Sequence, residues 1–414
     1  MSFVSHVECT VCGQHHDAHR LLTVCEKCGQ MLAARYDTDR VRAGVTREAL
    51  RMRPPGMYRF RELTPLDDLE EPVTLGEGST PLLALPRLAR HFGLDRLWAK
   101  DEGQNPTGSF KARGLGMAVT RARTLGARGL VIPSAGNAGG AAAVYGARSG
   151  LPVAVIVPRA TPAGAIAEAQ IAGAHVFTVE GSIADAGKVV AKAARAVGWF
   201  DLSTLKEPYR LEGKKTMGLE LAEQLGWRMP DVLLYPTGGG TGLVGIPKGY
   251  EELKAIGWLS GPLPRIYAIQ AEGCAPVVKA FHDGAENTEP FPNPATNAPG
   301  LRVPSPFAGR QMLRILRETK GGAVAVSEPA IVEAQHLVAR TEGIWAMPEA
   351  AALVTALGIL KDRGEVTRDT EVVMVFTGAG IKYLPPPLPS PVDLTGSPDE
   401  AAATVQRVLA ASAR

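Results

Sequence analysis

The sequence feature that most constrains the fold is an alternation, beginning near residue 76, of short β-branched runs with alanine-rich stretches. The short apolar runs predict buried strands, and the alanine-rich stretches between them predict helices. A strand followed by a helix and another strand needs a crossover connection, so the alternation predicts an α/β fold with mainly parallel sheets. In open sheets of this kind, ligands bind beyond the carboxyl ends of the strands.

Individual elements can be assigned from the same pattern. The predicted strands are 130–133, 153–157, 175–179, 232–235, 266–270, 323–326 and 372–376. The predicted helices are 138–149, 163–172, 183–197, 211–225, 242–256, 329–341, 349–363 and 398–411. The charged, proline-bearing residues 36–75 predict a connecting arm. The proline-rich residues 385–391 predict an extended linker, because proline continues neither a helix nor a central strand.

Length and charge limit the classes of function. A chain of 414 residues is long enough for two or three domains. Its formal net charge of +3 is small for this length and gives no sign of a nucleic-acid or membrane-surface partner. No apolar run is long enough to span a bilayer, and the N-terminus lacks the basic and then apolar pattern of a signal peptide. We therefore expect a cytoplasmic protein that binds neither nucleic acid nor membranes.

Four of the five cysteines lie in the first 28 residues, as Cys9-x2-Cys12 and Cys25-x2-Cys28. Each pair can present two thiolates from one turn, and two such pairs complete a tetrahedral zinc site. The alternatives are disulfide bonds or a metal-free segment. We predict a zinc-ribbon-like segment over residues 1–35, whose metal is structural because four protein ligands leave no open coordination position.

One lysine, Lys111, stands in a setting suited to covalent chemistry, within the sequence SFKARG (109–114). A lysine amine attacks an aldehyde to form a Schiff base only when it is unprotonated, so burial or a neighbouring cation has to lower its pKa. We predict that Arg113, two residues further on, is that cation. The competing interpretation is an ordinary surface lysine at the start of a helix.

A second candidate segment, PSAGNAGG (133–140), follows a predicted strand and opens a helix. Free backbone N–H groups at the start of a helix attract anions, and here we expect a substrate carboxylate on Ser134, Ala135 and Gly136. Asn137 adds a side-chain donor at the same point, although a side chain at this position can equally cap the helix.

A third segment, the glycine loop (238–242), places four glycines in five residues directly after another predicted strand. Such a loop lets the backbone wrap a phosphate group without the help of a lysine. A sharp strand-to-helix turn is the alternative, but it does not require so many glycines. The residues of this loop are Gly238, Gly239, Gly240, Thr241 and Gly242.

The last predicted strand is followed by Thr377, whose hydroxyl can hydrogen-bond to a ring nitrogen. A Schiff-base lysine, a phosphate-binding loop, an asparagine donor and a neutral hydroxyl together predict a pyridoxal phosphate site made by Lys111, Asn137, Thr377 and the glycine loop. A hydroxyl does not hold the pyridine nitrogen protonated as a carboxylate would. We therefore expect elimination or replacement chemistry rather than transamination, with Lys111 moving protons.

The glycine loop also fits a different cofactor. Gly240-x-Gly242-x-x-Gly245 matches the dinucleotide-binding pattern, and Glu272 closes the next predicted strand. The acidic residue of that pattern usually follows after about 20 residues, whereas Glu272 lies 32 residues beyond Gly240. A nicotinamide-dependent oxidoreductase would also leave Lys111 without a role.

On these residues the chain resembles the pyridoxal-phosphate enzymes of fold type II, and more narrowly the threonine synthase family. The likeness covers most of residues 1–385 and includes the cysteine pairs, LGEGSTPL (75–82), the Lys111 segment, PYRLEGKKT (208–216) and TGAGIK (377–382). The resemblance implies the Schiff base at Lys111, with Asn137 and Thr377 as partners of the cofactor's phenolic oxygen and ring nitrogen. It also implies a homodimer that converts O-phospho-L-homoserine and water to L-threonine and phosphate.

The resemblance further implies two three-layer α/β/α domains with mostly parallel sheets, in addition to the zinc-ribbon-like segment. Residues 36–112 and 200–385 would form a large cofactor-binding domain, and residues 113–199 a small inserted α/β domain. Residues 386–414 would form a proline-rich linker and a C-terminal helix.

Departures from the family pattern bear on the substrate. Ala112 stands where the family usually has aspartate, the glycine loop lacks asparagine, and residues 203–207 lack the asparagine that the family often carries before Arg210. Arg210, Lys214 and Lys215 remain candidates for binding a substrate phosphate, or else the two lysines lie on a solvated helix face. The alternatives are a β-eliminating ammonia-lyase or dehydratase acting on serine, threonine or diaminopropionate, a β-replacement synthase acting on phosphoserine, and a non-enzymatic paralog.

Overall fold

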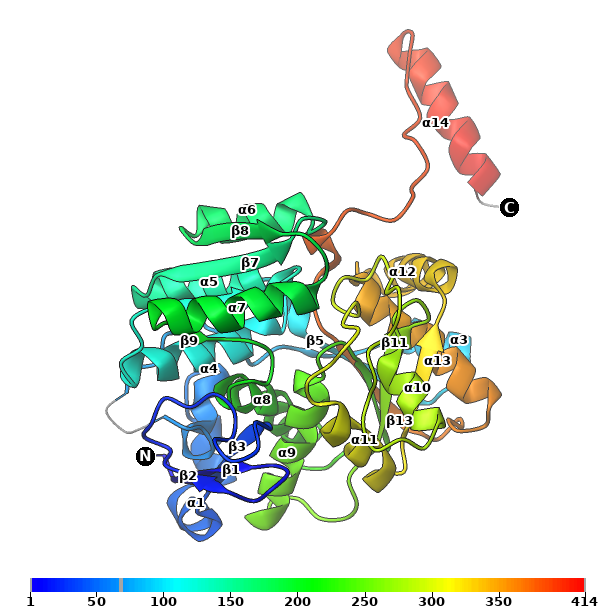
Figure 1. Cartoon of the computed structure of the whole chain (residues 1–414). Coiled ribbons are helices and arrows are strands. Elements are labelled where there is room, and N and C mark those ends of the chain that lie inside the picture. Colours follow the sequence, from blue (N-terminus) through cyan, green and yellow to red (C-terminus); the bar gives the residue numbers. More distant parts are fainter. Residues whose placement is uncertain (1, 67–69, 413–414) are drawn as a thin grey trace. The chain divides into compact units, whose positions relative to one another are not determined.

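The strands form three separate sheets, all of them in the first of the two units into which the chain divides, Met1–Tyr383 and Leu384–Arg414 (Figure 1). The computed structural model describes residues 2–66 and 70–412. The second unit contains the helix α14 (Pro398–Ser412) after a stretch without regular structure, as the proline-rich sequence predicts.

The largest sheet has six strands in the order β12-β11-β10-β13-β5-β4. Every neighbouring pair is parallel except β4 and β5, which are antiparallel at one edge. The strands are β4 (Leu82–Ala84), β5 (Arg96–Asp101), β10 (Val232–Pro236), β11 (Arg265–Ala271), β12 (Gly322–Val326) and β13 (Glu371–Phe376).

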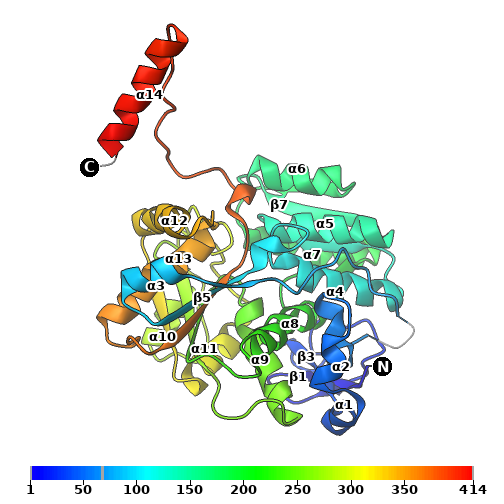
Figure 2. The same ribbon diagram turned by 180° about the vertical axis from the view of Figure 1, so that it is seen from behind.

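Helices cover both faces of this sheet because successive strand residues point to opposite sides. Leu233 and Val373 face one set of helices, while Leu234 and Met374 face the other. The first set is α8 (Tyr209–Gln224), α9 (Thr241–Ala255), α10 (Pro276–His282) and α11 (Gly309–Glu318). The second set, gathered together in Figure 2, is α3 (Pro86–Phe92), α12 (Glu328–Glu342) and α13 (Pro348–Asp362). The predicted three-layer architecture is confirmed for this sheet.

The second sheet is entirely parallel, in the order β8-β7-β6-β9. Its strands are β6 (Leu130–Pro133), β7 (Val153–Pro158), β8 (His175–Val179) and β9 (Phe200–Asp201). The helices α5 (Asn137–Ser149) and α6 (Ala163–Ile171) cover one face, and α7 (Ile183–Val197) covers the other. The helix α4 (Lys111–Thr124) packs against both α5 and α8 and so connects the two sheets.

The N-terminal sheet is antiparallel and consists of β1 (Val4–Cys9), β2 (His15–His16) and β3 (Leu32–Tyr36). Residues 36–75, predicted to be a connecting arm, contain helices that were not predicted from the sequence. They contain α1 (Thr38–Gly44), α2 (Arg47–Arg51) and a 3-10 helix, Met57–Leu63, while residues 67–69 lie outside the described part. Side chains of Asp37 and Thr46 cap α1 and α2, a signal that the sequence contained.

The sheets bring the carboxyl ends of several strands together. β5, β13 and β10 are successive parallel neighbours, so the segments that follow them emerge at one edge of the large sheet.

In the described residues, no helix is long and apolar enough to cross a membrane. The presence of separate sheets supports, as a proposal, the division into a zinc-ribbon-like segment (1–35), a large domain (36–112 and 200–385) and a small inserted domain (113–199).

Candidate active site

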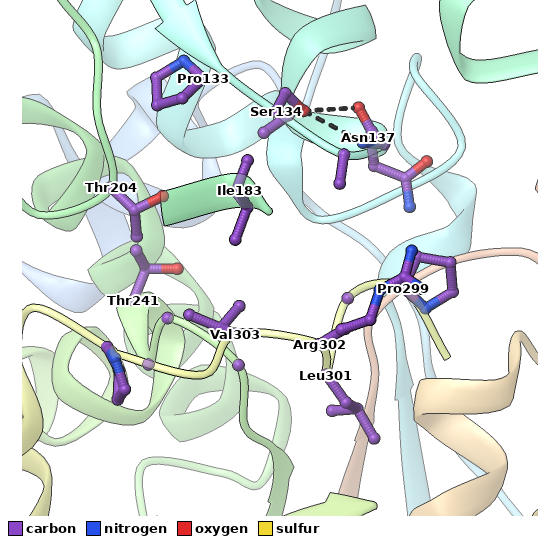
Figure 3. Close-up of a pocket in the computed structure, with 18 of the residues that line it drawn as sticks. Pro133, Ser134, Asn137, Ile183, Thr204, Thr241, Pro299, Leu301, Arg302 and Val303 are labelled. Carbon is purple, nitrogen blue, oxygen red and sulfur yellow. Dashed lines mark hydrogen bonds between the residues drawn. The ribbon is translucent and has the colours of Figure 1, made fainter. Parts of the chain in front are cut away.

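A cavity of about 520 Å³ lies where the segments after β6, β10 and β13 meet the start of α4 (Figure 3). The loop 299–307 completes its wall. Most of the residues predicted for the site line this cavity, although they are far apart in the sequence. They are Lys111, Ser134, Ala135, Gly136, Asn137, Gly238, Gly239, Gly240, Thr241 and Thr377.

Lys111 is the first residue of α4 and its amine lies 3.8 Å from the centre of the Phe110 ring. Burial and, to a smaller extent, the positive charge of Arg210 lower the pKa of this amine to about 7, against the opposing effect of the Glu349 carboxylate. An amine with such a pKa is unprotonated in a large fraction of molecules at neutral pH. It can therefore act as a nucleophile and as a base.

The cation that lowers the pKa of Lys111 is Arg210, and the prediction of Arg113 is wrong. Arg113 forms ion pairs of 2.6 Å with Glu102 and Glu220, and all three side chains are buried. The physical reason is helical geometry, because residues two apart on a helix point in nearly opposite directions. Arg113 therefore points away from Lys111 into a charge network between helices.

The segment 134–137 forms a turn organised by the Ser134 hydroxyl, which accepts hydrogen bonds from the N–H groups of Gly136 (3.2 Å) and Gly139 (2.8 Å). The same hydroxyl donates to the carbonyl of Gly136 at 2.9 Å. Among the described residues, no partner is found for the backbone N–H groups of Ala135 and Asn137. These amides fit the predicted carboxylate site, whereas the Ser134 side chain serves the turn itself.

Asn137 is not a helix cap, since α5 has no side-chain capping hydrogen bond. Its Nδ2 instead donates to the Tyr383 hydroxyl at 3.0 Å, and that hydroxyl donates to Oε1 of Glu349 at 3.3 Å. Burial raises the pKa of Glu349. The sequence reasoning missed Tyr383 and Glu349, although Tyr383 lies six residues after Thr377 and Glu349 begins a predicted helix.

The glycine loop needs its glycines for close packing as well as for its turn. Gly240 has φ of 76°, and a Cβ there would overlap Met312. A Cβ on Gly238 would overlap the carbonyl of Gly300. Among the described residues, the N–H groups of Gly238, Gly239 and Gly240 have no hydrogen-bond partner, so they are available to a phosphate.

The dinucleotide-like spacing of glycines has a structural explanation. Gly242 does not line the cavity, and a Cβ on it would overlap the Tyr235 hydroxyl. A Cβ on Gly245 would come within 3.0 Å of the Lys214 Cβ, where α9 crosses α8. Close packing of neighbouring elements therefore accounts for these two glycines without a dinucleotide.

Thr377 follows β13 and is buried in the cavity wall. Its hydroxyl contacts only the sulfur of Met347, at 3.5 Å, among the hydrogen bonds of the described residues. A thioether is a weak acceptor, so the hydroxyl remains able to pair with a ring nitrogen.

The three predicted cations of α8 do not line the cavity, contrary to the prediction for the substrate phosphate. Arg210 donates to the Leu202 carbonyl at 2.7 Å. Lys214 donates to the Phe110 carbonyl, and burial together with Lys111 lowers its pKa well below the usual value. The solvated-face alternative is also wrong, because α8 is buried from Tyr209 to Ala222.

Lys215 is held in a separate buried cluster of charges. Its ammonium group lies 2.5 Å from Glu212 and 2.8 Å from Glu252. Lys248 pairs with the same two carboxylates, and the Tyr36 hydroxyl donates to Glu212 at 2.7 Å. The cluster therefore joins β3 to α8 and α9. Its two carboxylates neutralise both lysines, so Lys215 is not available to bind a substrate.

A different cation, Arg302 in the loop 299–307, lines the cavity (Figure 3). Its side chain is half-buried and forms no ion pair or side-chain hydrogen bond with any described residue. The sequence contained no local signal for this role, since Arg302 lies in a proline-rich stretch without a recognised motif.

The four N-terminal cysteines lie close together in space, outside the cavity. Their sulfur atoms all lie within 4.8 Å of one another, with 3.7 Å between Cys12 and Cys25. All four are free thiols, so the disulfide alternative is wrong. Four thiolates at this spacing match the ligand set of a tetrahedral zinc ion.

Comparison with known proteins agrees with the cavity's chemistry. The family model "Pyridoxal-phosphate dependent enzyme" matches residues 73–378. Threonine synthase of Methanosarcina acetivorans is 38% identical over 91% of this chain and 92% of that protein. Threonine synthase of Methanocaldococcus jannaschii is 37% identical over 90% of this chain and 92% of that protein.

Solved structures show the same fold. A fungal L-serine ammonia-lyase from Rhizomucor miehei has a TM-score of 0.62 and 22% identity, covering 73% of this chain and 93% of that chain. Maize serine racemase has a TM-score of 0.62 and 21% identity, covering 81% of this chain and 94% of that chain.

The residues of the cavity fit pyridoxal phosphate. A lysine of lowered pKa, free loop amides, an asparagine amide and an available threonine hydroxyl surround one space. Each matches one functional group of the cofactor: aldehyde, phosphate, phenolic oxygen and ring nitrogen. The chain therefore belongs to the pyridoxal-phosphate-dependent enzymes of fold type II and, within them, to the threonine synthase family.

Proposed function

We propose that this enzyme converts O-phospho-L-homoserine and water to L-threonine and phosphate. The observation that carries the proposal is the position of Lys111, whose pKa is about 7, in one cavity with the glycine loop, Asn137 and Thr377. Relatives named threonine synthase, 37–38% identical over at least 90% of this chain, support the choice of reaction.

The bound cofactor would supply an electron sink for negative charge at the substrate's Cα. The backbone amides of Gly238–Gly240 would hold the cofactor phosphate, Asn137 would donate to its phenolic oxygen, and Thr377 would meet its ring nitrogen. Lys111 would hold the cofactor and, once released by the substrate amine, would take the Cα proton and later return it. The neutral Thr377 hydroxyl disfavours transamination in favour of elimination and water addition.

The remaining cavity residues would bind the two anionic ends of the substrate. The free backbone N–H groups of Ala135 and Asn137 would donate to the substrate carboxylate at the start of α5. Arg302 would bind the substrate phosphate, because it lines the cavity and its guanidinium has no ion pair or side-chain hydrogen bond among the described residues, whereas Lys206, which also lines the cavity, lies over the Phe307 ring. Arg210 would not contact the substrate directly. Its positive charge would act from behind the cavity wall.

Arg302→Gln is expected to raise the KM for O-phosphohomoserine by roughly ten- to a hundredfold, the effect of losing a charge-assisted hydrogen bond. Steady-state kinetics and competitive inhibition by inorganic phosphate measure this. Substitution of the exposed Arg310, which pairs with Glu286 outside the cavity, provides the control. An unchanged KM and unchanged phosphate inhibition would move the phosphate site elsewhere.

The reaction itself is tested by a comparison of substrates. The enzyme is incubated separately with O-phosphohomoserine, serine, threonine and diaminopropionate, and phosphate, threonine and oxoacid are measured. We expect phosphate and threonine in equal amounts from O-phosphohomoserine. Oxoacid from the free amino acids without phosphate chemistry would instead assign a β-eliminating ammonia-lyase, and consumption of phosphoserine with a second nucleophile would assign a β-replacement synthase.

Capture of pyridoxal phosphate by the apoprotein is expected to become faster as pH rises and to level off above about 7. Burial and Arg210 lower the pKa of the Lys111 amine from 10.5 to about 7, and only the unprotonated amine attacks the aldehyde. Stopped-flow absorbance over a pH series measures the rate. A midpoint near 10.5 would show that the amine is not perturbed in the free protein.

We propose that Cys9, Cys12, Cys25 and Cys28 hold a structural zinc ion. The segment between the cysteine pairs docks on the catalytic body: the Arg121 side chain donates to the carbonyl of Ala18 at 2.8 Å, and the Tyr209 hydroxyl donates to that of Arg20 at 3.0 Å. The ion would therefore brace this segment against α4 and α8.

Removal of zinc by a chelator, or Cys25→Ser, is expected to lower the thermal midpoint while the kcat of the protein that remains folded stays close to that of the wild type. Metal analysis, calorimetry and kinetics measure the three quantities. Cys274→Ser, at a cysteine outside the cluster, should keep the zinc content. Loss of kcat without loss of stability would give the cluster a catalytic role.

The homodimer and the cytoplasmic location stay predictions.

A further inference from the structure

A chain of hydrogen bonds crosses the cavity wall beside Lys111. The backbone N–H of Gly300 donates to Oε1 of Glu349 at 2.6 Å. The Tyr383 hydroxyl donates to the same oxygen at 3.3 Å, and Nδ2 of Asn137 donates to the Tyr383 hydroxyl at 3.0 Å. Glu349, Tyr383 and Asn137 all line the cavity, although they come from α13, the segment after β13 and the start of α5.

These contacts give the chain a single direction when Oε1 of Glu349 carries no proton. Oε1 of Glu349 receives the Gly300 N–H, so it acts as an acceptor whether or not the other carboxyl oxygen carries a proton. Tyr383 has a single O–H, which it gives to that oxygen. Its own oxygen is then left only as an acceptor, and Asn137 has to turn its nitrogen rather than its carbonyl oxygen toward Tyr383.

Burial keeps Tyr383 in the donor form. It raises the pKa of the phenol well above the usual value, and the nearby Glu349 carboxylate raises it further. The hydroxyl therefore stays protonated at neutral pH, and the direction of the chain is maintained over the range in which the enzyme would work.

The orientation of the amide decides what Asn137 can offer to a ligand. An amide nitrogen carries two N–H donors, and Tyr383 takes one of them. The second remains for an anionic oxygen, whereas an amide turned the other way would bring its carbonyl oxygen against that anion. Figure 3 shows the Asn137 amide extending from the turn at Ser134 toward the loop that carries Pro299.

We propose that Tyr383, anchored by Glu349, is a positioning residue that presents the nitrogen end of Asn137 to the phenolic oxygen of bound pyridoxal phosphate. The inference rests on the proposed function, since it requires the cofactor to be linked to Lys111. Tyr383 acts through Asn137 and does not itself have to touch the cofactor.

The test uses the holoenzyme and the variant Tyr383→Phe, which keeps the ring and removes the hydroxyl. The visible absorbance of the bound cofactor is followed over pH, and cofactor loss is followed on dilution. We expect the pH midpoint of the absorbance change to shift, and the cofactor to be held roughly three- to tenfold more weakly, the effect of one hydrogen bond. Tyr267→Phe is the matched control, because Tyr267 donates to Glu365 at 2.8 Å outside the cavity.

A double-mutant cycle separates positioning from general packing. In an Asn137→Ala background, Tyr383→Phe should produce no further change in the absorbance or the cofactor affinity, because its effect passes through Asn137. Glu349→Gln should change little, because the Gly300 N–H selects the carbonyl oxygen of the glutamine, and that oxygen still accepts from Tyr383. If Glu349→Gln does not fold, the cycle on Asn137 and Tyr383 is sufficient.

An absorbance profile of Tyr383→Phe identical to that of the wild type would overturn the inference, as would a full effect of Tyr383→Phe in the Asn137→Ala background. Failure of the proposed function is a different result. In that case the wild-type protein itself would show no lysine-bound cofactor.

Discussion

Lys111→Ala is expected to abolish the visible absorbance of lysine-bound pyridoxal phosphate and to lower kcat on the order of 10⁴-fold, the upper range for loss of a proton-transferring group. The reason is that one amine both holds the cofactor and moves the Cα proton. The free amides of the glycine loop stay in place in this variant, so the cofactor should still bind, but without a covalent bond. Absorbance, equilibrium dialysis and single-turnover kinetics measure the three effects.

Borohydride reduction followed by peptide mass spectrometry identifies the linked residue in the wild-type protein. Lys111 should be the modified lysine. The informative competitor is Lys214, which is also buried, also has a lowered pKa and interacts electrostatically with Lys111. Cofactor trapped on Lys214, or a covalent adduct that survives in Lys111→Ala, would contradict the assignment. Lys279→Ala, at an exposed lysine paired with Asp283, should behave as the wild type.

Arg113→Met is expected to lower the free energy of unfolding by about 3–5 kcal/mol, as for a buried ion pair that loses one partner. Arg113 forms two hydrogen bonds with Glu102 (2.6 and 2.8 Å) and two with Glu220 (2.6 and 2.7 Å). Of these two carboxylates, only Glu220 also accepts a hydrogen bond from Lys100, at 2.7 Å. Without the guanidinium, buried carboxylates face one another with too little positive charge. Chemical denaturation of the variant and the wild type measures the difference.

The cost of this substitution should depend on pH. Arg113 holds the pKa of Glu102 and of Glu220 below the usual value for glutamate, so its contribution is present above that value and is lost as pH falls. In Arg113→Met the carboxyls should take up protons more readily. The destabilisation should therefore be largest at neutral pH and shrink as the pH is lowered toward the usual pKa of glutamate.

Arg368→Met is the matched control for Arg113. Arg368 pairs with Asp95 at 3.0 Å, but the two side chains are 81% and 52% exposed, so solvent screens the pair. Its loss should cost less than about 1 kcal/mol. A similar cost for both substitutions would show that the burial of the Arg113 network contributes little, and that the large expected effect has another origin.

The predictions from sequence that succeeded depend on neighbouring residues. The strand at 130–133 and the helix at 183–197 match β6 and α7 at both ends, because apolar period, glycine and capping residues act over a few positions. The motifs at Lys111, Asn137, the glycine loop and Thr377 were found in the same way. Parallel pairing in the large sheet then brought together the segments of Lys111, the glycine loop and Thr377, and the packing of α4 against α5 brought Asn137 to them.

The errors arose where function depends on contacts between distant segments. Arg113 lies two residues from Lys111 in the sequence but turns away from it, whereas Arg210, 99 residues beyond Lys111, lowers the pKa of Lys111. Lys215 carried the pattern of a solvated or ligand-binding cation, yet the packing of α8 against α9 buries it among carboxylates.

By itself, the sequence determined the class of fold, the cysteine cluster and the residues that match the cofactor, because strand and helix periodicity, turn chemistry and nucleophile type are local properties. Only the tertiary structure decided which cation acts on Lys111, which charges are neutralised by burial, and that Tyr383 and Glu349 reach Asn137. Those properties depend on distances between side chains that lie far apart along the chain, and charge interactions in a buried site change steeply with such distances.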